Sequence, residues 1–223
     1  PDSQHLAWPW LWKGRWRVMV DGKSPKNQLF DGVIMDEPWT PDGRLVAVVF
    51  QGGEQSLLVD GQVVSTARAI RHVHDRPAAS WARDPLAWVE RCDEGERLVV
   101  GERKGQLWAA VGEVAVSEDG EKWAYEAVDE QGHQYIVVDG KTRGPFDQVA
   151  RLGFSATGKL AFLALSDGRW RLHVGESVSP GFLRVQDVAL LSDAAVLMVG
   201  RNGARRHVLR GEPDADVWTE QGS

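Results

Sequence analysis

The chain has 223 residues, of which 43% are hydrophobic and 26% charged, so it has enough apolar residues to bury a core. Its formal net charge of −6 argues against nucleic acid or an anionic membrane surface as the main partner, because both attract clustered positive charge. The only cysteine, Cys92, excludes an intrachain disulfide and any metal or iron–sulfur site made from several cysteines of this chain.

The sequence also bears on location. No apolar run approaches the roughly 18–20 residues that span a bilayer, and no signal-peptide pattern is present. We therefore expect no direct membrane insertion and a cytoplasmic protein, either free or peripheral on a membrane complex. The expectation changes to the periplasm if a signal peptide precedes Pro1.

One unit recurs six times along the chain. Short apolar runs are centred on residues 7, 47, 87, 124, 161 and 197, with spacings of 36 to 40 residues. Thirteen to fifteen residues after each centre comes a tight turn, written Val20-Asp21-Gly22, Val59-Asp60-Gly61 and Val138-Asp139-Gly140 in three of the copies. Asp-Gly supplies the positive φ angles that two-residue hairpin turns require. A third feature follows 20 to 23 residues after each centre, at Phe30, Ile70, Trp108, Phe146, Phe182 and Trp218.

Each unit has the pattern of short β-strands. In the second unit we expect strands over residues 43–50, 55–59 and 62–66, with residues 76–81 as a fourth. Four strands in about 40 residues are typical of a propeller blade. The sequence therefore predicts an all-β fold, a single β-propeller domain over residues 1–223 with four-stranded repeats at about 1–40, 41–81, 82–118, 119–156, 157–193 and 194–223.

The innermost strands of the blades are expected just before the turn that opens each unit. They are predicted over Val33–Trp39, Pro77–Trp81, Glu113–Ser117, Val149–Ser155 and Val185–Leu191. The first unit has no such strand, which leaves three alternatives. Upstream residues supply it, the first blade is incomplete, or five blades close and the remainder packs elsewhere. We favour six blades with an abbreviated first blade, and five blades is the alternative.

The opening turns resemble a known repeat. Trp39-Thr40-Pro41-Asp42-Gly43 and Ser117-Glu118-Asp119-Gly120, each followed by an apolar strand and a Val-Asp-Gly turn, resemble the WD-like repeats of TolB-type bacterial propellers. The third unit departs from this pattern at residues 82–85, and the sixth has lost both Pro and Gly. The resemblance covers the whole chain and implies architecture, while propellers serve many functions.

The chain has 11 tryptophans, and three of them are candidate partner-binding residues. Trp8 and Trp88 hold an apolar position of the repeat, where we expect core. The position of Trp10 holds Phe50, Glu90, Ala127, Ala164 and Gly200 in the other units, and that of Trp12 holds Gly52, Cys92, Asp129, Ser166 and Asn202. These small or polar residues indicate a strand tip near solvent, where Trp10, Trp12 and Trp16 would form a docking surface. The alternative is that these tryptophans cover an opening where the ring is incomplete.

Two other groups are weaker candidates. His72 and His74 lie on one face of a strand, but two imidazoles without a third ligand indicate a solvated outer strand, and we expect no metal site. Acidic residues expected near the channel, Asp36, Glu37, Glu113 and Asp187, could form the carboxylate pair of a glycan-active propeller. The units carry no insertions that would build a substrate cleft, so we expect no catalytic residues.

The sequence thus favours a non-catalytic propeller that acts as a protein interaction or scaffold subunit, without a cofactor. A small, tryptophan-rich, WD-like protein resembles the accessory subunit of transmembrane redox complexes in sulfate-reducing bacteria, and that resemblance implies membrane-bound redox subunits as partners. The alternatives are a glycan- or small-molecule-active propeller with channel carboxylates and a periplasmic TolB-like module.

Overall fold

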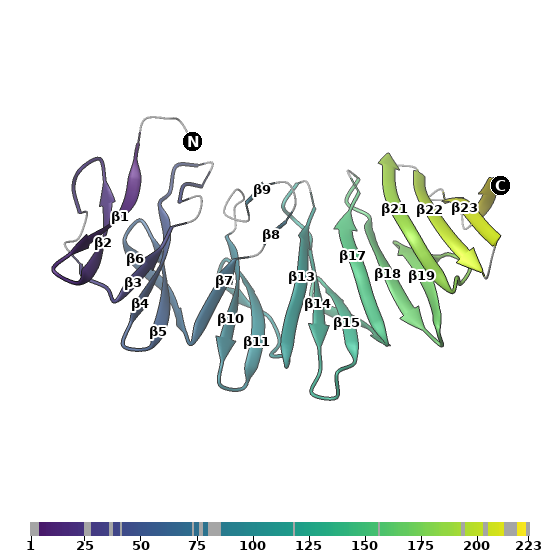
Figure 1. Ribbon diagram of the computed structural model, residues 1–223, viewed down its shortest axis with the longest axis horizontal. Helices are drawn as coiled ribbons and strands as arrows, with labels where there is room; N and C mark the ends of the chain where they lie inside the picture. Colours follow the sequence, from purple (N-terminus) through teal and green to yellow (C-terminus); the bar gives the residue numbers. More distant parts are fainter. Residues whose placement is uncertain are drawn as a thin grey trace. The chain divides into compact units, whose positions relative to one another are not determined.

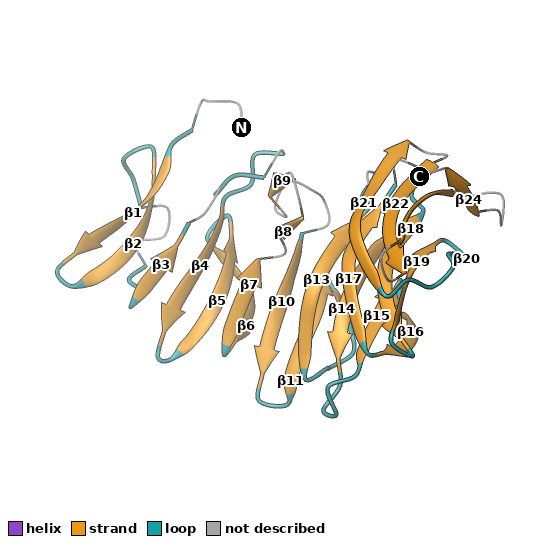
Figure 2. Cartoon of the chain, turned by 45° about the vertical axis from the view of Figure 1, so that its right-hand side comes forward, coloured by secondary structure: helices purple, strands orange, loops and turns teal. Residues whose placement is uncertain are grey.

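A computed structural model shows an all-β chain (Figures 1 and 2). It describes residues 5–24, 28–35, 38–40, 42–72, 74–75, 78–79, 86–117, 119–155, 157–192, 195–202, 205–211 and 218–221. This described part contains no helix, and so none that is long and apolar enough to cross a membrane. Its strands form five four-stranded antiparallel sheets and two two-stranded sheets. The predicted fold class, an all-β array of propeller blades, is therefore confirmed.

Strands pair in chain order within each sheet, except that β7 pairs with β10, and we number the sheets other than β8–β9 as blades 1 to 6 (Figure 1). Blades 1 to 3 belong to an N-terminal unit, residues 1–108, and blades 4 to 6 to a C-terminal unit, residues 109–223. Blade 1 consists of β1 (Ala7–Trp12) and β2 (Arg15–Val20). Blade 2 consists of β3 (Gly32–Ile34), β4 (Val46–Gln51), β5 (Glu54–Val59) and β6 (Gln62–Ala67). Blade 3 consists of β7 (Ala69–His72), β10 (Ala87–Cys92), β11 (Gly95–Val100) and β12 (Arg103–Lys104).

The C-terminal unit repeats the same order. Blade 4 consists of β13 (Ala110–Val116), β14 (Trp123–Val128), β15 (Gln134–Val138) and β16 (Lys141–Phe146). Blade 5 consists of β17 (Gln148–Phe154), β18 (Leu160–Ser166), β19 (Arg169–Val174) and β20 (Ser177–Val178). Blade 6 consists of β21 (Arg184–Ser192), β22 (Ala195–Asn202), β23 (Arg205–Gly211) and β24 (Trp218–Gln221).

One predicted inner strand is wrong. The strand paired with β10 is β7, whereas Pro77, Ser80 and Trp81 lie outside the described residues. Residues on either side of Pro77 form a separate hairpin of β8 (His74–Asp75) and β9 (Ala78–Ala79). His72 ends the innermost strand β7, so its interpretation as part of a solvated outer strand is wrong, and His74 lies on a different strand, β8. The other inner strands, β3, β13, β17 and β21, overlap the predicted ranges.

The repeated turn motifs have a shared hydrogen-bond pattern. Asp21, Asp60 and Asp139 have φ angles of 48°, 51° and 47°, which few residues other than Asn, Asp and Gly adopt readily. Each carboxylate also accepts the backbone N–H that precedes the blade's second strand, at Leu6 (2.9 Å), Leu45 (2.9 Å) and Trp123 (3.2 Å). Asp is therefore favoured at this position for two reasons: it tolerates a positive φ, and its carboxylate accepts a backbone N–H.

The opening turns are closed by a buried hydroxyl. Thr40, Ser117 and Ser155 are all buried, and each accepts a backbone N–H from the far side of its turn, from Arg44, Lys122 and Lys159. The hydroxyls of Thr40 and Ser117 also donate to Asp42 and Asp119, and these bonds lower the pKa of both carboxyls. The resemblance to the repeat motif thus has a local physical basis.

The core lies between blades, because each blade's second strand is apolar on both faces. On β4, Ala47 and Val49 pack toward blade 1, while Val46 and Val48 pack toward blade 3. The C-terminal unit has equivalent clusters between blades 4 and 5, around Phe162, and between blades 5 and 6, around Leu172. A blade face is therefore normally covered by the neighbouring blade.

The Val-Asp-Gly turn gives a first prediction. Asp60→Ala should lower the free energy of unfolding by about 2 kcal/mol, since it removes a hydrogen bond and replaces Asp with a residue that adopts the left-handed conformation less readily. Asp60→Gly should cost about 1 kcal/mol, because only the hydrogen bond is lost. Urea denaturation of both variants measures the two effects. An Asp60→Gly variant as stable as the parent would show that the carboxylate contributes nothing.

Candidate functional site

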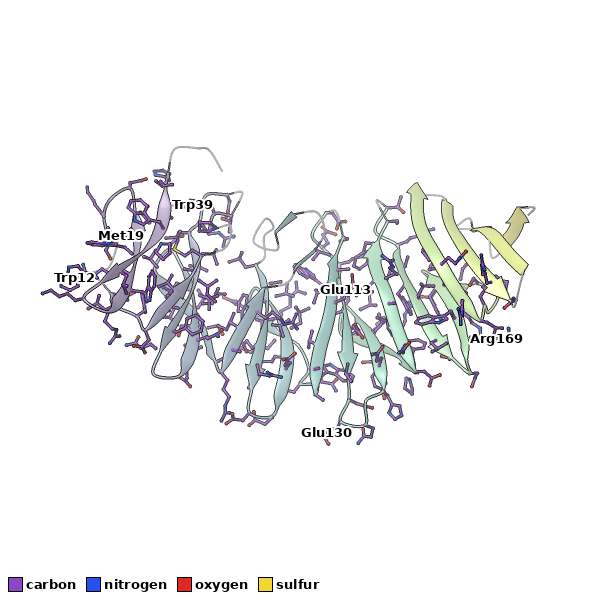
Figure 3. The ribbon with its side chains drawn as sticks, viewed as in Figure 1. Trp12, Met19, Trp39, Glu113, Glu130 and Arg169 are labelled. Atoms are coloured by element: carbon purple, nitrogen blue, oxygen red, sulfur yellow. The ribbon has the colours of Figure 1, made fainter. Side chains whose placement is uncertain are left out.

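The β1–β2 hairpin places three tryptophans on one face of blade 1. In its antiparallel register Trp8 lies opposite Met19, Trp10 opposite Arg17 and Trp12 opposite Arg15. Directly paired residues share a face, so these six side chains form one surface, which we call the tryptophan face. Ala7, Val18 and Val20 lie on the opposite face and pack against blade 2. Trp12 lies at the tip of the hairpin (Figure 3).

Exposure on the tryptophan face is greatest near the hairpin. Met19 is buried and Trp8 is half-buried, whereas 43% of Trp10 and 36% of Trp12 are exposed. The guanidinium of Arg17 lies 4.4 Å from the centre of the Trp12 ring, and the Lys13 ammonium lies 4.7 Å from it. Such cation–π contacts hold the indole in place. The Arg17 Nε is buried and has no hydrogen-bond acceptor among the described residues.

The predicted trio of Trp10, Trp12 and Trp16 does not form one surface. Trp16 pairs with Leu11 and so lies on the opposite side of the sheet, facing blade 2. It is half-buried and its backbone forms a two-way bridge with Phe30. Its counterparts Gln55 and Gln134 accept a backbone N–H from the next blade's inner strand, at Ile70 and Val149. Trp16 thus holds a position between blades.

The interpretation as a strand tip near solvent is wrong for the position of Trp10, whereas the counterparts of Trp12 are exposed or half-buried. The residues equivalent to Trp10 by strand pairing include Val49, Glu90, Ala127 and Ala164, and all four are at most 2% exposed. The second repeat also needs a shift of one residue, because Val46, not Ala47, has the pairing of Ala7, Ala87 and Ala161. Val49 and Gln51 therefore replace Phe50 and Gly52 as counterparts of Trp10 and Trp12. Trp10 is exposed at a position that the preceding blade covers in blades 2, 3 and 5.

Blade 3 fills this position with a buried ion pair. Glu90 and Arg97 are the counterparts of Trp10 and Arg17, and Arg97 donates to the Glu90 carboxylate through Nε (2.9 Å) and Nη2 (2.8 Å). Ser65 of blade 2 also donates to it, as does the Trp88 indole. Burial raises the pKa of Glu90, but these hydrogen bonds outweigh burial and lower the pKa overall. Blade 1 has the arginine without the carboxylate.

The edge of β1 opposite to β2, where other blades have their inner strand, is unpaired within the described residues. In blade 5 the equivalent edge belongs to Leu163, which pairs with Ala150 of the inner strand. Pro9 holds the place of Leu163 and has no N–H to donate. Proline is confined to edge strands for this reason, so the sequence of β1 disfavours a full inner strand beside it.

The candidate carboxylates are only partly described. Asp36 and Glu37 lie outside the described residues, as does the side chain of Asp187. Glu113 is exposed on β13 (Figure 3), where its backbone N–H bonds to the Glu126 carboxylate on β14. Burial raises the pKa of Glu126, and the charge of Glu113 raises it further. Glu126 was not a sequence candidate, because only the pairing of β13 with β14 brings it to Glu113.

Among the residues with described side chains, no three His, Cys, Asp or Glu residues lie close enough to hold a metal ion. The side chains of His72 and His74 are outside that set.

No family model matches this chain, and the comparison with curated proteins gives no relative. Solved structures that it resembles include TolB from Acinetobacter baumannii (13% identity, 93% of this chain and 60% of that chain, TM-score 0.37). They also include the oligogalacturonate lyase from Vibrio parahaemolyticus (13%, 82% and 63%, 0.37) and the Dos1 propeller (10%, 94% and 65%, 0.42). The chain spans less than two thirds of each of these three proteins. At these TM-scores the likeness carries no argument about activity or partners.

The Glu90 network gives a second prediction. Glu90→Gln should lower the free energy of unfolding by about 1–3 kcal/mol, because Arg97 loses a charged acceptor in a buried setting. Asp93→Asn is the matched control, since Asp93 pairs with Arg68 at an exposed site and its loss should cost less than about 1 kcal/mol. Thermal and urea denaturation measure both. Equal effects would show that burial adds nothing to the Glu90 pair.

Glu126 gives a third prediction, about pH. Its pKa lies above the ordinary 4.5 in the folded protein, so between these two values the folded protein keeps a proton that the unfolded chain has released. Stability therefore falls as pH rises through this window, and Glu126→Gln should make that fall shallower. Melting temperatures from pH 4 to pH 7 measure it, with Glu130→Gln on the exposed β14–β15 hairpin as control (Figure 3). An unchanged slope in Glu126→Gln would contradict the assignment.

Proposed function

We propose that this chain is a non-catalytic interaction module and that a partner protein covers its tryptophan face. The observation that carries the proposal is the exposure of Trp10 at a position that is buried in the other blades with described side chains, with Trp12 exposed beside it on the same face. Tryptophan is strongly enriched among the residues that dominate binding energy in protein interfaces. Burying these indoles in an interface provides the cover that a neighbouring blade provides elsewhere.

Arg17 and Pro9 of blade 1 indicate what kind of surface the partner presents. The Arg17 Nε has no acceptor, whereas the equivalent Arg97 is held by Glu90. We therefore expect the partner to present an apolar surface with a carboxylate that reaches Arg17. Pro9 disfavours a partner strand that extends the sheet at β1, so the partner docks onto the face of the blade.

The fourth prediction tests this face. The double variant Trp10→Ser/Trp12→Ser should weaken partner binding at least about thirtyfold, because each indole contributes a large share of a desolvated interface. Its unfolding should change little, since both indoles are substantially exposed. The matched control is Val63→Ser/Val64→Ser, which removes exposed apolar side chains from β6 of blade 2. If Trp10→Ser/Trp12→Ser unfolds the protein, these indoles are core and the proposal fails.

The partner itself is identified by parallel purification. Tagged parent, Trp10→Ser/Trp12→Ser and Val63→Ser/Val64→Ser chains are recovered from soluble and detergent-solubilised membrane fractions of the source organism and compared by mass spectrometry. A stoichiometric partner that is lost only from the tryptophan variant, and whose affinity for purified chain falls with Arg17→Glu, supports the proposal. Recovery of every variant without a partner contradicts it.

The same experiment tests the narrower proposal, an accessory subunit on a membrane-bound electron-transfer complex. Its support is the sequence resemblance described above. Recovery of iron–sulfur or cytochrome subunits from the membrane fraction would support both this role and a peripheral cytoplasmic location. A soluble partner without redox cofactors would overturn the narrower proposal and leave the docking face in place.

A further inference from the structure

The C-terminal unit contains an open cleft of about 310 Å³ between blades 5 and 6. Its lining comes from two inner strands, β17 and β21, and from the adjoining β18 and β19. The lining residues are Ala150, Arg151, Leu163, Trp170, Arg184, Val185, Gln186 and Val188. No residue of the tryptophan face takes part, so this cleft is separate from the proposed docking site.

Trp170, which lines the cleft, replaces a glutamine. In blades 2 and 4, Gln55 and Gln134 lie at the position of Trp170, and each accepts the backbone N–H of the next inner strand, at distances of 2.7 and 2.5 Å. By strand pairing, Val185 of β21 is the counterpart of those donor residues, Ile70 and Val149. An indole cannot accept this bond, since its nitrogen only donates. Val185 and Trp170 both line the cleft, and Trp170 offers the N–H of Val185 no acceptor.

The floor of the cleft is apolar. Trp170 is partly buried and packs with Leu163, Leu172 and Val188 in the core between blades 5 and 6. A flat apolar group can therefore lie against the indole without crossing a polar surface.

The rim of the cleft is basic. Arg151 and Arg184 are both exposed and line it, and neither forms an ion pair or a side-chain hydrogen bond with a described residue. Arg151 has a φ of 59° at the bulge of β17, the only positive φ among described non-glycine residues that lies within a strand. Strained backbone of this kind concentrates at binding sites. None of the lining residues carries a negative charge.

We propose that this cleft binds a small aromatic carboxylate. The ring lies against Trp170, and the carboxylate accepts hydrogen bonds from Arg151, Arg184 and the N–H of Val185. Guanidinium groups bind carboxylates through paired, charge-assisted hydrogen bonds, which accounts for two arginines without an acidic partner at the rim.

The experiment uses the full chain labelled with ¹⁵N at the tryptophan indoles. The chain has 11 tryptophans, and the Trp170 signal is assigned from a Trp170→Phe variant. Titration with benzoate should shift the Trp170 signal and leave those of Trp10 and Trp12 unchanged. Acetate should bind at least about tenfold more weakly, because it lacks the ring, and benzyl alcohol should leave the signal in place, because it lacks the charge. A Trp170 signal that benzyl alcohol shifts as strongly as benzoate overturns the proposal.

Arginine variants complete the test. Arg151→Gln and Arg184→Gln should each weaken benzoate binding at least about fivefold. Arg169→Gln is the matched control. Arg169 precedes Trp170 in β19, so its side chain lies on the opposite face of the sheet from the Trp170 indole (Figure 3). Equal weakening in all three variants would mean attraction by net charge alone and would overturn the proposal. If a glutamine variant loses its dispersed indole spectrum, Arg184→Lys keeps the charge and should bind benzoate with intermediate affinity.

Neither outcome depends on the tryptophan face. The Trp10 and Trp12 signals report that face in the same spectra, so failure of the cleft and failure of the docking surface are distinguishable.

Discussion

Packing of one sheet face against the next is the interaction on which the rest of this structure depends. The second strand of blade 2 is apolar on both sides, as Val46 and Ala47 of β4 show, and each side is buried against a neighbouring blade. The turns support this arrangement, because the Asp carboxylates and buried hydroxyls satisfy the backbone at strand ends that would otherwise be left unpaired. Both proposed sites are places where this face-to-face packing is incomplete.

On blade 1 the packing face is open to solvent. Trp10 takes a position that is filled in blade 3 by Glu90 and in blades 4 and 5 by alanine, and with Trp12 it exposes a large apolar surface beside an arginine that lacks a carboxylate partner. Between blades 5 and 6 the neighbour is present, but Trp170 removes the hydrogen bond that ties the next inner strand in blades 2 and 4. The first opening is broad and suits a protein surface. The second is a narrow cleft with basic groups and suits a small anion.

Both sites stand out when equivalent positions of the repeat are compared. An exceptional residue in one copy of a repeat becomes informative once its counterparts are known, because those counterparts show the environment that the position normally has. Glu90 and Arg97 show that the position of Trp10 and Arg17 can hold a buried ion pair, and Val49, Ala127 and Ala164 show that the position of Trp10 is buried in the other described blades. Gln55 and Gln134 show that the position of Trp170 normally carries an acceptor. Without those comparisons the same tryptophans would be unremarkable core residues.

The sequence by itself determined the fold class, the period of the repeat, the Asp-Gly hairpins and most inner strands, because these features depend on local turn chemistry and on strand-length apolar runs. It also indicated that Trp10 and Trp12 are unusual. It could not determine the register within Val46–Val49, since four consecutive apolar residues fit either alignment and only the pairing of β4 with β5 decides between them. The tertiary structure alone decided that Trp16 faces blade 2, that β7 replaces the strand predicted at residues 77–81, that Glu126 meets Glu113, and that Arg151 and Arg184 share a cleft with Trp170. Each of these facts depends on contacts between strands distant in sequence or on which side of a sheet a residue lies, and a one-residue change of register reverses that side.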